Sequence, residues 1–203
     1  MRRQKLIEAA VVAGIFTLWG GIAHADGGGA NTEEFSARLN GFNVTGALGA
    51  GETGAILTDA TGTLQLDLDK KSQPPMATYT LTFSNLSAAV TQAHIHFGKV
   101  HVPGGIFVWL CQTAAKPAPT AVAGTTPFCP TAGGTVSGTI TSASIIAPAA
   151  SPPTSQGITA NDFDALTDAL NSDSAYVNVH TVNFPAGEIR GQIRGDDHQK
   201  DHN

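Results

Sequence analysis

Three histidines carry the only concentrated chemistry in this sequence. His94 and His96 are separated by one residue, and His180 lies in a later segment. On a β-strand, residues two apart point to the same face, so the side chains of His94 and His96 project from backbone positions about 6 to 7 Å apart. Two imidazoles can span this distance to one metal ion. Imidazole is the commonest metal ligand, although histidine is also an ordinary surface residue. The pattern predicts a metal site at His94, His96 and His180, on the outer, wetter face of a sheet.

Copper is the expected metal, with zinc the second choice, because divalent copper generally has the higher affinity for imidazole. Three protein ligands leave one coordination position open, and His101 is a candidate fourth ligand. Arg190 either attracts small anions to the site or bonds a neighbouring strand, and its alternation with apolar residues favours the second role. No nucleophile elbow, phosphate loop or dinucleotide fingerprint is present, so no catalytic residue is assigned.

Alternating apolar and polar residues dominate the chain from Glu34 onward. Leu64, Leu66 and Leu68 alternate with polar residues, and the same period recurs in 79–83, 93–97, 175–182 and 188–194. A period of two is typical of antiparallel strands with one buried face. Many short strands predict an all-β protein, a Greek-key β-sandwich. We expect its core to include these residues: Ile95, Phe97, Val177, Val179, Ile189 and Ile193.

One short helix is expected near the C-terminal strands. Thr159 is the expected N-cap, and Phe163, Leu166 and Leu170 form an apolar stripe. The helix should pack across an open end of the sandwich.

Cys111 and Cys129 are the only cysteines. In an oxidising compartment an isolated pair favours a structural disulfide over a metal or redox site. We expect this bond to clamp a long loop.

The N-terminal segment indicates export. Basic residues at 2, 3 and 5 precede an apolar run, and Ala23-His24-Ala25 offers small residues at the two positions that a signal peptidase reads. We expect a signal peptide at 1–25, a flexible leader at 26–33, one domain at 34–194 and a disordered charged tail at 195–203 that contains His198 and His202. The processed protein should be secreted or periplasmic.

The charge of the processed chain excludes two classes of partner. Residues 1–25 carry three basic groups and one acidic group, so their removal changes the formal charge from −5 to −7. No cluster of Lys and Arg remains to bind nucleic acid or an anionic membrane. The apolar run at 9–22 is too short to span a bilayer comfortably, so we expect no stable membrane insertion after processing.

Four segments together resemble the CHRD domain, a module named after chordin and also found in exported bacterial proteins. They are AHIHFG (93–98), PGGIFVWLC (103–111), GTVSGTI (134–140) and YVNVHTVNFPAGEIRGQI (176–193). The resemblance runs from about Phe35 to Arg194. It implies an extracellular module and little about activity.

The chain also resembles copper/zinc superoxide dismutases, which are Greek-key β-sandwiches with a His-X-His strand, a later copper-ligand His and an Arg before the last strand. His94, His96, His180 and Arg190 occur in that order. The resemblance implies a copper-like site at the three histidines. Residues 113–135 contain no His, Asp or Glu, so the zinc site of those enzymes has no counterpart, and the cysteines are placed differently.

Three hypotheses follow. The first is an exported CHRD-type module that binds one transition metal. The second is an interaction or structural module without a metal, in which the outer strands or the 113–134 loop meet a protein or matrix partner. The third is a dismutase-like enzyme, which requires Arg190 beside an open coordination position.

Overall fold

Antiparallel pairing joins nine strands into one sheet in the computed structural model, which describes residues 32–46, 54–148 and 156–195. Strands of the front layer alternate buried and exposed residues, as the period of two predicts, whereas those of the rear layer are buried on both faces. The strands are β1 (Thr32–Asn40), β2 (Thr61–Asp69), β3 (Met76–Ser84), β4 (Val90–Phe97), β5 (Gly105–Cys111), β6 (Gly134–Ile140), β7 (Ala175–Thr181), β8 (Ile189–Gln192) and β9 (Arg194–Gly195).

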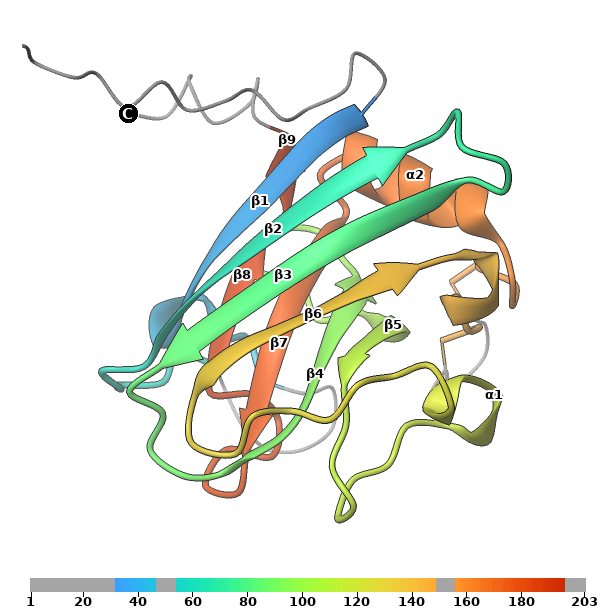
Figure 1. The fold of residues 1–203 in the computed structure, drawn as a ribbon. Coiled ribbons are helices and arrows are strands. Elements are labelled where there is room, and N and C mark those ends of the chain that lie inside the picture. Colours follow the sequence, from blue (N-terminus) through green and yellow to red (C-terminus); the bar gives the residue numbers. More distant parts are fainter. Residues whose placement is uncertain (1–31, 47–53, 149–155, 196–203) are drawn as a thin grey trace, which may run out of the picture.

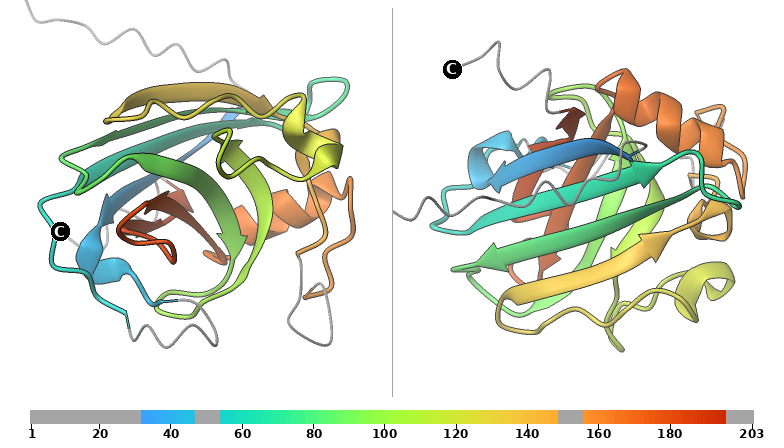
Figure 2. Two further views of the ribbon diagram at one scale, coloured as in Figure 1. Left: turned by 90° about the horizontal axis from the view of Figure 1, so that it is seen from below. Right: turned by 45° about the horizontal axis from the view of Figure 1, so that its top comes forward.

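The sheet curls round on itself to enclose the core. Its order is β5-β4-β7-β8-β1-β2-β3-β6, and β9 pairs with β1. Strands β1, β2, β3 and β6 form the front layer in Figure 1, and β4, β5, β7 and β8 lie behind them; the curl is seen end-on in Figure 2. Because β8 returns to lie beside β1 of the β1-β2-β3 meander, the topology is of the Greek-key type. The predicted all-β, Greek-key class is confirmed.

The two layers pack their apolar faces together. Leu64, Leu66 and Leu68 of β2 face Ile95 and its neighbours across the core, and all four side chains are fully buried. The expected core residues Val177, Val179, Ile189 and Ile193 are also fully buried. Phe97, at the end of β4, is only partly buried and packs against the edge of this core. Except for Phe97, the predicted core is confirmed.

Three contacts link the edge strand β5 to strands and loops at the opposite edge of the curled sheet, where β6 lies. The Cys111–Cys129 disulfide forms as predicted and ties the end of β5 to the loop before β6. Tyr79 of β3 donates a hydrogen bond to the carbonyl of Leu110 at 2.6 Å. A single bridge pairs Val108 with Ile145. In the chain-entropy account, the disulfide stabilises the fold by about 3 kcal/mol, because it closes a loop of intermediate length.

Helix α2 (Phe163–Asn171) lies at one end of the curled sheet, shortly before the C-terminal strands (Figure 1). Its apolar stripe is buried, as predicted. The expected N-cap at Thr159 is wrong, because the side chain of Asp162 accepts the hydrogen bond from the backbone N–H of Ala165. A carboxylate at the cap satisfies a free N–H group and interacts favourably with the helix dipole. The short helix α1 (Thr120–Ala123), in the loop before β6, is an addition to the prediction.

Two expected boundaries differ from the structure. Strand β1 begins at Thr32, so the last two residues of the expected leader pair with β2. Strand β9 includes Gly195, the first residue of the expected tail. The expected signal peptide, His198 and His202 lie outside the described residues. No helix within the described ranges is long and apolar enough to cross a membrane.

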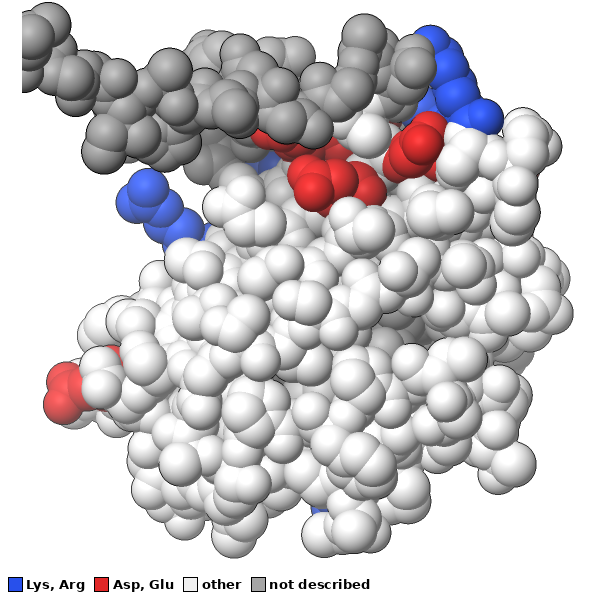
Figure 3. Space-filling view, viewed as in Figure 1, with Lys and Arg blue, Asp and Glu red and all other residues white. Residues whose placement is uncertain are grey.

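The outer face of the front layer carries no charged residue on β3, whereas β1 and β2 carry Glu34, Arg38 and Asp67. Figure 3 shows acidic residues gathered at one end of this face and a broad white surface below them. The outward residues of β3 are Thr78, Thr80, Thr82 and Ser84, and Thr80 and Thr82 meet the hydroxyls of Ser137 and Thr135 on β6. Arg38 is accompanied on this face by acidic residues, so the described part of the face has no cluster of basic groups of the kind that nucleic-acid binding requires.

Candidate metal centre

The paired strands β4 and β7 of the rear layer bring the three histidines together. His94 lies opposite Asn178 in the antiparallel register, and His180 lies opposite Gln92. His94 and His180 are therefore diagonal neighbours on one face, and His96 follows His94 by one period of the strand. The opposite parity, which includes Ile95, faces the core. The prediction that these histidines share one face is confirmed.

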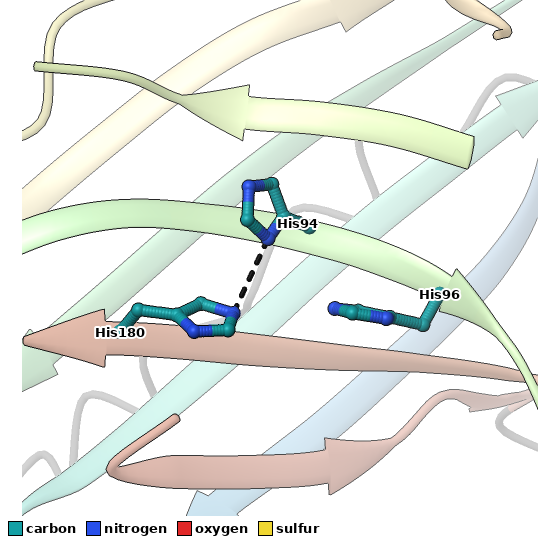
Figure 4. Close-up of side chains that lie close together, drawn as sticks. All are labelled: His94, His96 and His180. Carbon is teal, nitrogen blue, oxygen red and sulfur yellow. Dashed lines mark hydrogen bonds between the residues drawn. The ribbon is translucent and has the colours of Figure 1, made fainter. Parts of the chain in front are cut away.

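The three imidazoles converge on one point. One potential ligand nitrogen from each ring can be chosen so that all three lie within 4.8 Å of one another. The Nδ1 of His94 lies 3.2 Å from the Nε2 of His180. Figure 4 shows the ring of His96 pointing toward these two. With metal–nitrogen bonds of about 2 Å, ligand nitrogens around one ion stand about 3.3 to 3.6 Å apart, so the site needs only a small contraction.

The prediction that these histidines are exposed to solvent is wrong. His94 is 0% exposed, His180 5% and His96 7%. They do lie on the side of the sheet away from the core, but that side is covered. Trp109 of β5 packs edge-on against His94, with ring centroids 4.2 Å apart, and two chain segments cover the other rings.

The first segment is residues 98–104, which we call the cover loop. His96 donates its Nδ1 proton to the carbonyl of Gly104 at 2.9 Å, and the N–H of Gly104 is bonded to the hydroxyl of Tyr176. A Cβ at position 104 would lie 1.8 Å from the carbonyl oxygen of Phe97, so only glycine allows this approach. The ring of Tyr176 stacks on His96 at 4.6 Å.

The second segment is the turn between β7 and β8. His180 donates its Nδ1 proton to the carbonyl of Pro185 at 2.9 Å. Gly187 has φ of +122°, and a Cβ there would lie 2.3 Å from the side chain of Asn178. Glycine therefore lets the turn close over β7 and present the carbonyl of Pro185 to the ring.

These two carbonyls fix the tautomers of His96 and His180. A neutral imidazole that donates from Nδ1 has its lone pair at Nε2. The Nε2 of His180 faces His94, whereas the Nε2 of His96 is buried with no hydrogen-bond partner among the described residues. The Nε2 of His94 is likewise buried without one. Backbone carbonyls that orient imidazoles in this way are typical of metal-binding histidines.

Burial keeps all three histidines neutral. Desolvation lowers the pKa of His96 to about 3 and that of His180 to about 4. The pKa of His94 lies well below its usual value, first because of burial and second because of its two histidine neighbours. Neutral imidazole is the form that binds a metal, so no proton has to leave these rings near pH 7.

Arg190 of β8 lies beneath the cover loop. Its guanidinium sits 3.6 Å from the centre of the Tyr176 ring, and it donates to the carbonyls of Lys99 and Val102 at 3.1 Å and to the hydroxyl of Thr45 at 2.6 Å. At 2% exposure it is not the outward cross-strand partner that the alternation favoured. Its bonds hold the cover loop closed instead.

Glu188 is a second buried charge, which the sequence did not single out. Its carboxylate accepts from the hydroxyls of Thr58, Ser87 and Thr181 and from the N–H of Ser87. Burial alone raises its pKa, but these four hydrogen bonds outweigh that effect and hold the pKa below its usual value. The network fixes the start of β8 beside the end of β7, and so fixes the turn that holds His180.

The remaining candidate ligand, His101, lies on the exposed side of the cover loop and is not part of the converging group. Trp109 and Tyr176 are the ring contacts that sequence reasoning missed. Tyr176 falls on the parity of His180, so the alternation of β7 contained a usable signal, whereas β5 is apolar throughout and gave none for Trp109.

Comparison with known proteins assigns the chain to a family. No curated protein and no solved structure matched it. The model of the CHRD domain matches residues 35–193, a range that includes β2 to β8, most of β1, the three histidines, the cover loop and the β7–β8 turn. Because the match spans most of the 203 residues, the chain belongs to the CHRD domain family.

Proposed function

We propose that this CHRD domain binds one transition metal ion through His94, His96 and His180. The buried Nε2 of His96 carries the proposal, because its lone pair points at the other two rings and has no donor among the described residues. An unpartnered buried polar atom costs about 1 to 3 kcal/mol. A metal ion would accept that lone pair together with those of His94 and His180.

Copper is the favoured ion and zinc the second choice, because imidazole ligands follow the general affinity order of divalent metals. Bound copper would supply a centre for one-electron exchange. The chain's own contribution is to orient His96 through Gly104, to orient His180 through Pro185 and to exclude water with the cover loop.

A copper titration of the purified protein tests this function. Trp109 packs on His94, and a chain that begins at Asp26 has no other tryptophan, so Cu(II) should quench its fluorescence to an end point at about one equivalent. The variants are made in an H198A/H202A background, which removes the tail histidines. H180A should abolish the quenching, whereas H101A, a matched histidine outside the group, should retain it. Equal quenching in H180A and H101A would overturn the proposal.

We also propose that the protein is exported. Residues 1–25 have the pattern of a signal peptide, and the Cys111–Cys129 disulfide is compatible with an oxidising compartment. Mass analysis of the protein from the medium or periplasm should give a chain that starts at Asp26. A retained N-terminal segment would contradict this.

An interaction module is the second candidate function. The loop at 113–134 is held rigid, since Gln112 bonds to Ala118, Ala123 and Thr126 within it, and the disulfide anchors Cys129. Phe128, next to Cys129, is 71% exposed. A rigid loop with an exposed aromatic ring suits a protein partner. This function remains if the protein binds no metal.

We do not propose dismutase activity. That reaction requires Arg190 beside an open metal position, but its guanidinium is bonded to the cover loop and separated from His96 by the ring of Tyr176.

A further inference from the structure

We infer that the histidine site is built for cuprous copper, Cu(I), in preference to Cu(II) or Zn(II). The inference rests on the proposed function and names the oxidation state of its metal. Two independent features carry it: the number of ligands and the charge around them.

The site offers three protein ligands, fewer than the number that Zn(II) and Cu(II) prefer. Zinc sites in proteins are almost always four-coordinate, and Cu(II) prefers a tetragonal arrangement. The converging group holds three histidines and no carboxylate or further histidine within the described ranges. Because the Nε2 atom of His96 is buried away from solvent, a water ligand beside it would have to displace part of the cover. Cu(I) is satisfied by three imidazoles.

The cover loop and the turn between β7 and β8 resist the rearrangement that a fourth ligand would require. Gly104 contacts both His96 and Tyr176, and Arg190 bonds to two carbonyls of the cover loop. The turn over His180 is fixed by Pro185 and by the Glu188 network. The cover loop and the turn therefore hold the rings of His96 and His180 in one arrangement, which suits an ion with few ligands.

The charge of the surroundings favours the ion with the smaller charge. All three ligands are neutral, and the nearest buried charge is the cation of Arg190, stacked on Tyr176 behind His96. Glu188 cannot compensate, because its carboxylate is engaged by Thr58, Ser87 and Thr181. A divalent ion is repelled by this cation twice as strongly as a monovalent one.

Competition titrations of the purified protein test the preference. Cu(I) is kept reduced by ascorbate under nitrogen and competed with bicinchoninate, while Cu(II) is competed with nitrilotriacetate and Zn(II) with a pyridylazo dye. We expect one equivalent of Cu(I) to be retained, with an affinity about 1000-fold above that for Zn(II), since zinc lacks its fourth ligand. If Zn(II) or Cu(II) binds as tightly as Cu(I), the inference is wrong and the metal-binding function stands. If none of the three binds stoichiometrically, the proposed function itself fails.

Substitution of Arg190 separates charge from geometry. R190M removes the charge and keeps an unbranched stem against Tyr176, and it should raise the affinity for Cu(II) relative to Cu(I) by about tenfold, or about 59 mV in a one-electron potential. R38M, which removes an exposed arginine of β1, is the matched control and should leave the ratio unchanged. R190K keeps the positive charge, so it should preserve the preference even if the cover loop loosens. If R190M and R38M have the same ratio of Cu(II) affinity to Cu(I) affinity, the electrostatic argument is wrong.

Discussion

A fall in pH from 7.5 to 5 is expected to remove about 4 kcal/mol from the free energy of unfolding of the metal-free protein, through His96 and His180 alone. In the unfolded chain both groups titrate near pH 6.5, whereas burial lowers the pKa of His96 to about 3 and that of His180 to about 4 in the folded protein. The unfolded state therefore binds more protons below pH 6.5, and stability falls as the pH decreases from 6.5 toward the folded pKa values. Each group contributes about 2 kcal/mol over this range.

His94 adds to the loss in the same direction, because its pKa is also lowered by burial. A total stability of about 5 to 15 kcal/mol is usual for a domain, so acid should remove a large share of it. Urea unfolding followed by Trp109 fluorescence at the two pH values measures the effect. H180Q, which has one buried imidazole fewer, should reduce the pH dependence by about 2 kcal/mol. H101A is the control, since that side chain is exposed, and should keep the full dependence. A stability that is the same at pH 7.5 and pH 5 would show that the histidines are not buried in a neutral form.

The period of the strands was sufficient to predict which residues share a face. Because a strand alternates with a period of two, His94 and His96 had to stand opposite Ile95, and Val177 and Val179 opposite His180. What the alternation could not show is the pairing of β4 with β7, which brings residues from distant segments to one point. The resemblance to superoxide dismutases implied that the three histidines share a site, but no motif in the sequence gave the register of β4 against β7.

The burial of the site was not predictable from the alternation. The histidines lie on the outer face of the sheet, and polar residues on such a face are normally solvated. The cover depends on specific contacts of Gly104, Pro185 and Trp109 with the rings, which the alternation of apolar and polar residues does not report. Arg190 was misjudged for the same reason, because its partners Lys99 and Val102 come from another part of the chain.

Replacement of Glu188 by leucine is expected to destabilise the protein by about 4 kcal/mol, because hydrogen bonds to a charged acceptor contribute about 1.5 to 3 kcal/mol each. The carboxylate is 0% exposed and joins Thr58 and Ser87 to Thr181 at the end of β7. Leucine fills a similar volume but leaves these donors, and the N–H of Ser87, without their acceptor. Urea unfolding at pH 7.5 measures the loss.

The same substitution should weaken the metal site, although Glu188 contacts none of the three histidines. The carboxylate holds Thr181, the residue after His180, and the N–H of Glu188 itself bonds to the carbonyl of Val179, so the turn that carries Pro185 closes on this network. With the network broken, the carbonyl of Pro185 no longer fixes the ring of His180, and loss of such an orienting partner typically lowers metal affinity about 10- to 100-fold. E188Q, which keeps one acceptor oxygen, should fall between the wild type and E188L in both measurements. E34L, at an exposed glutamate of β1, is the matched control and should change stability by no more than about 0.5 kcal/mol. If E188L lost stability yet bound copper as tightly as E34L, the turn would not be what orients His180.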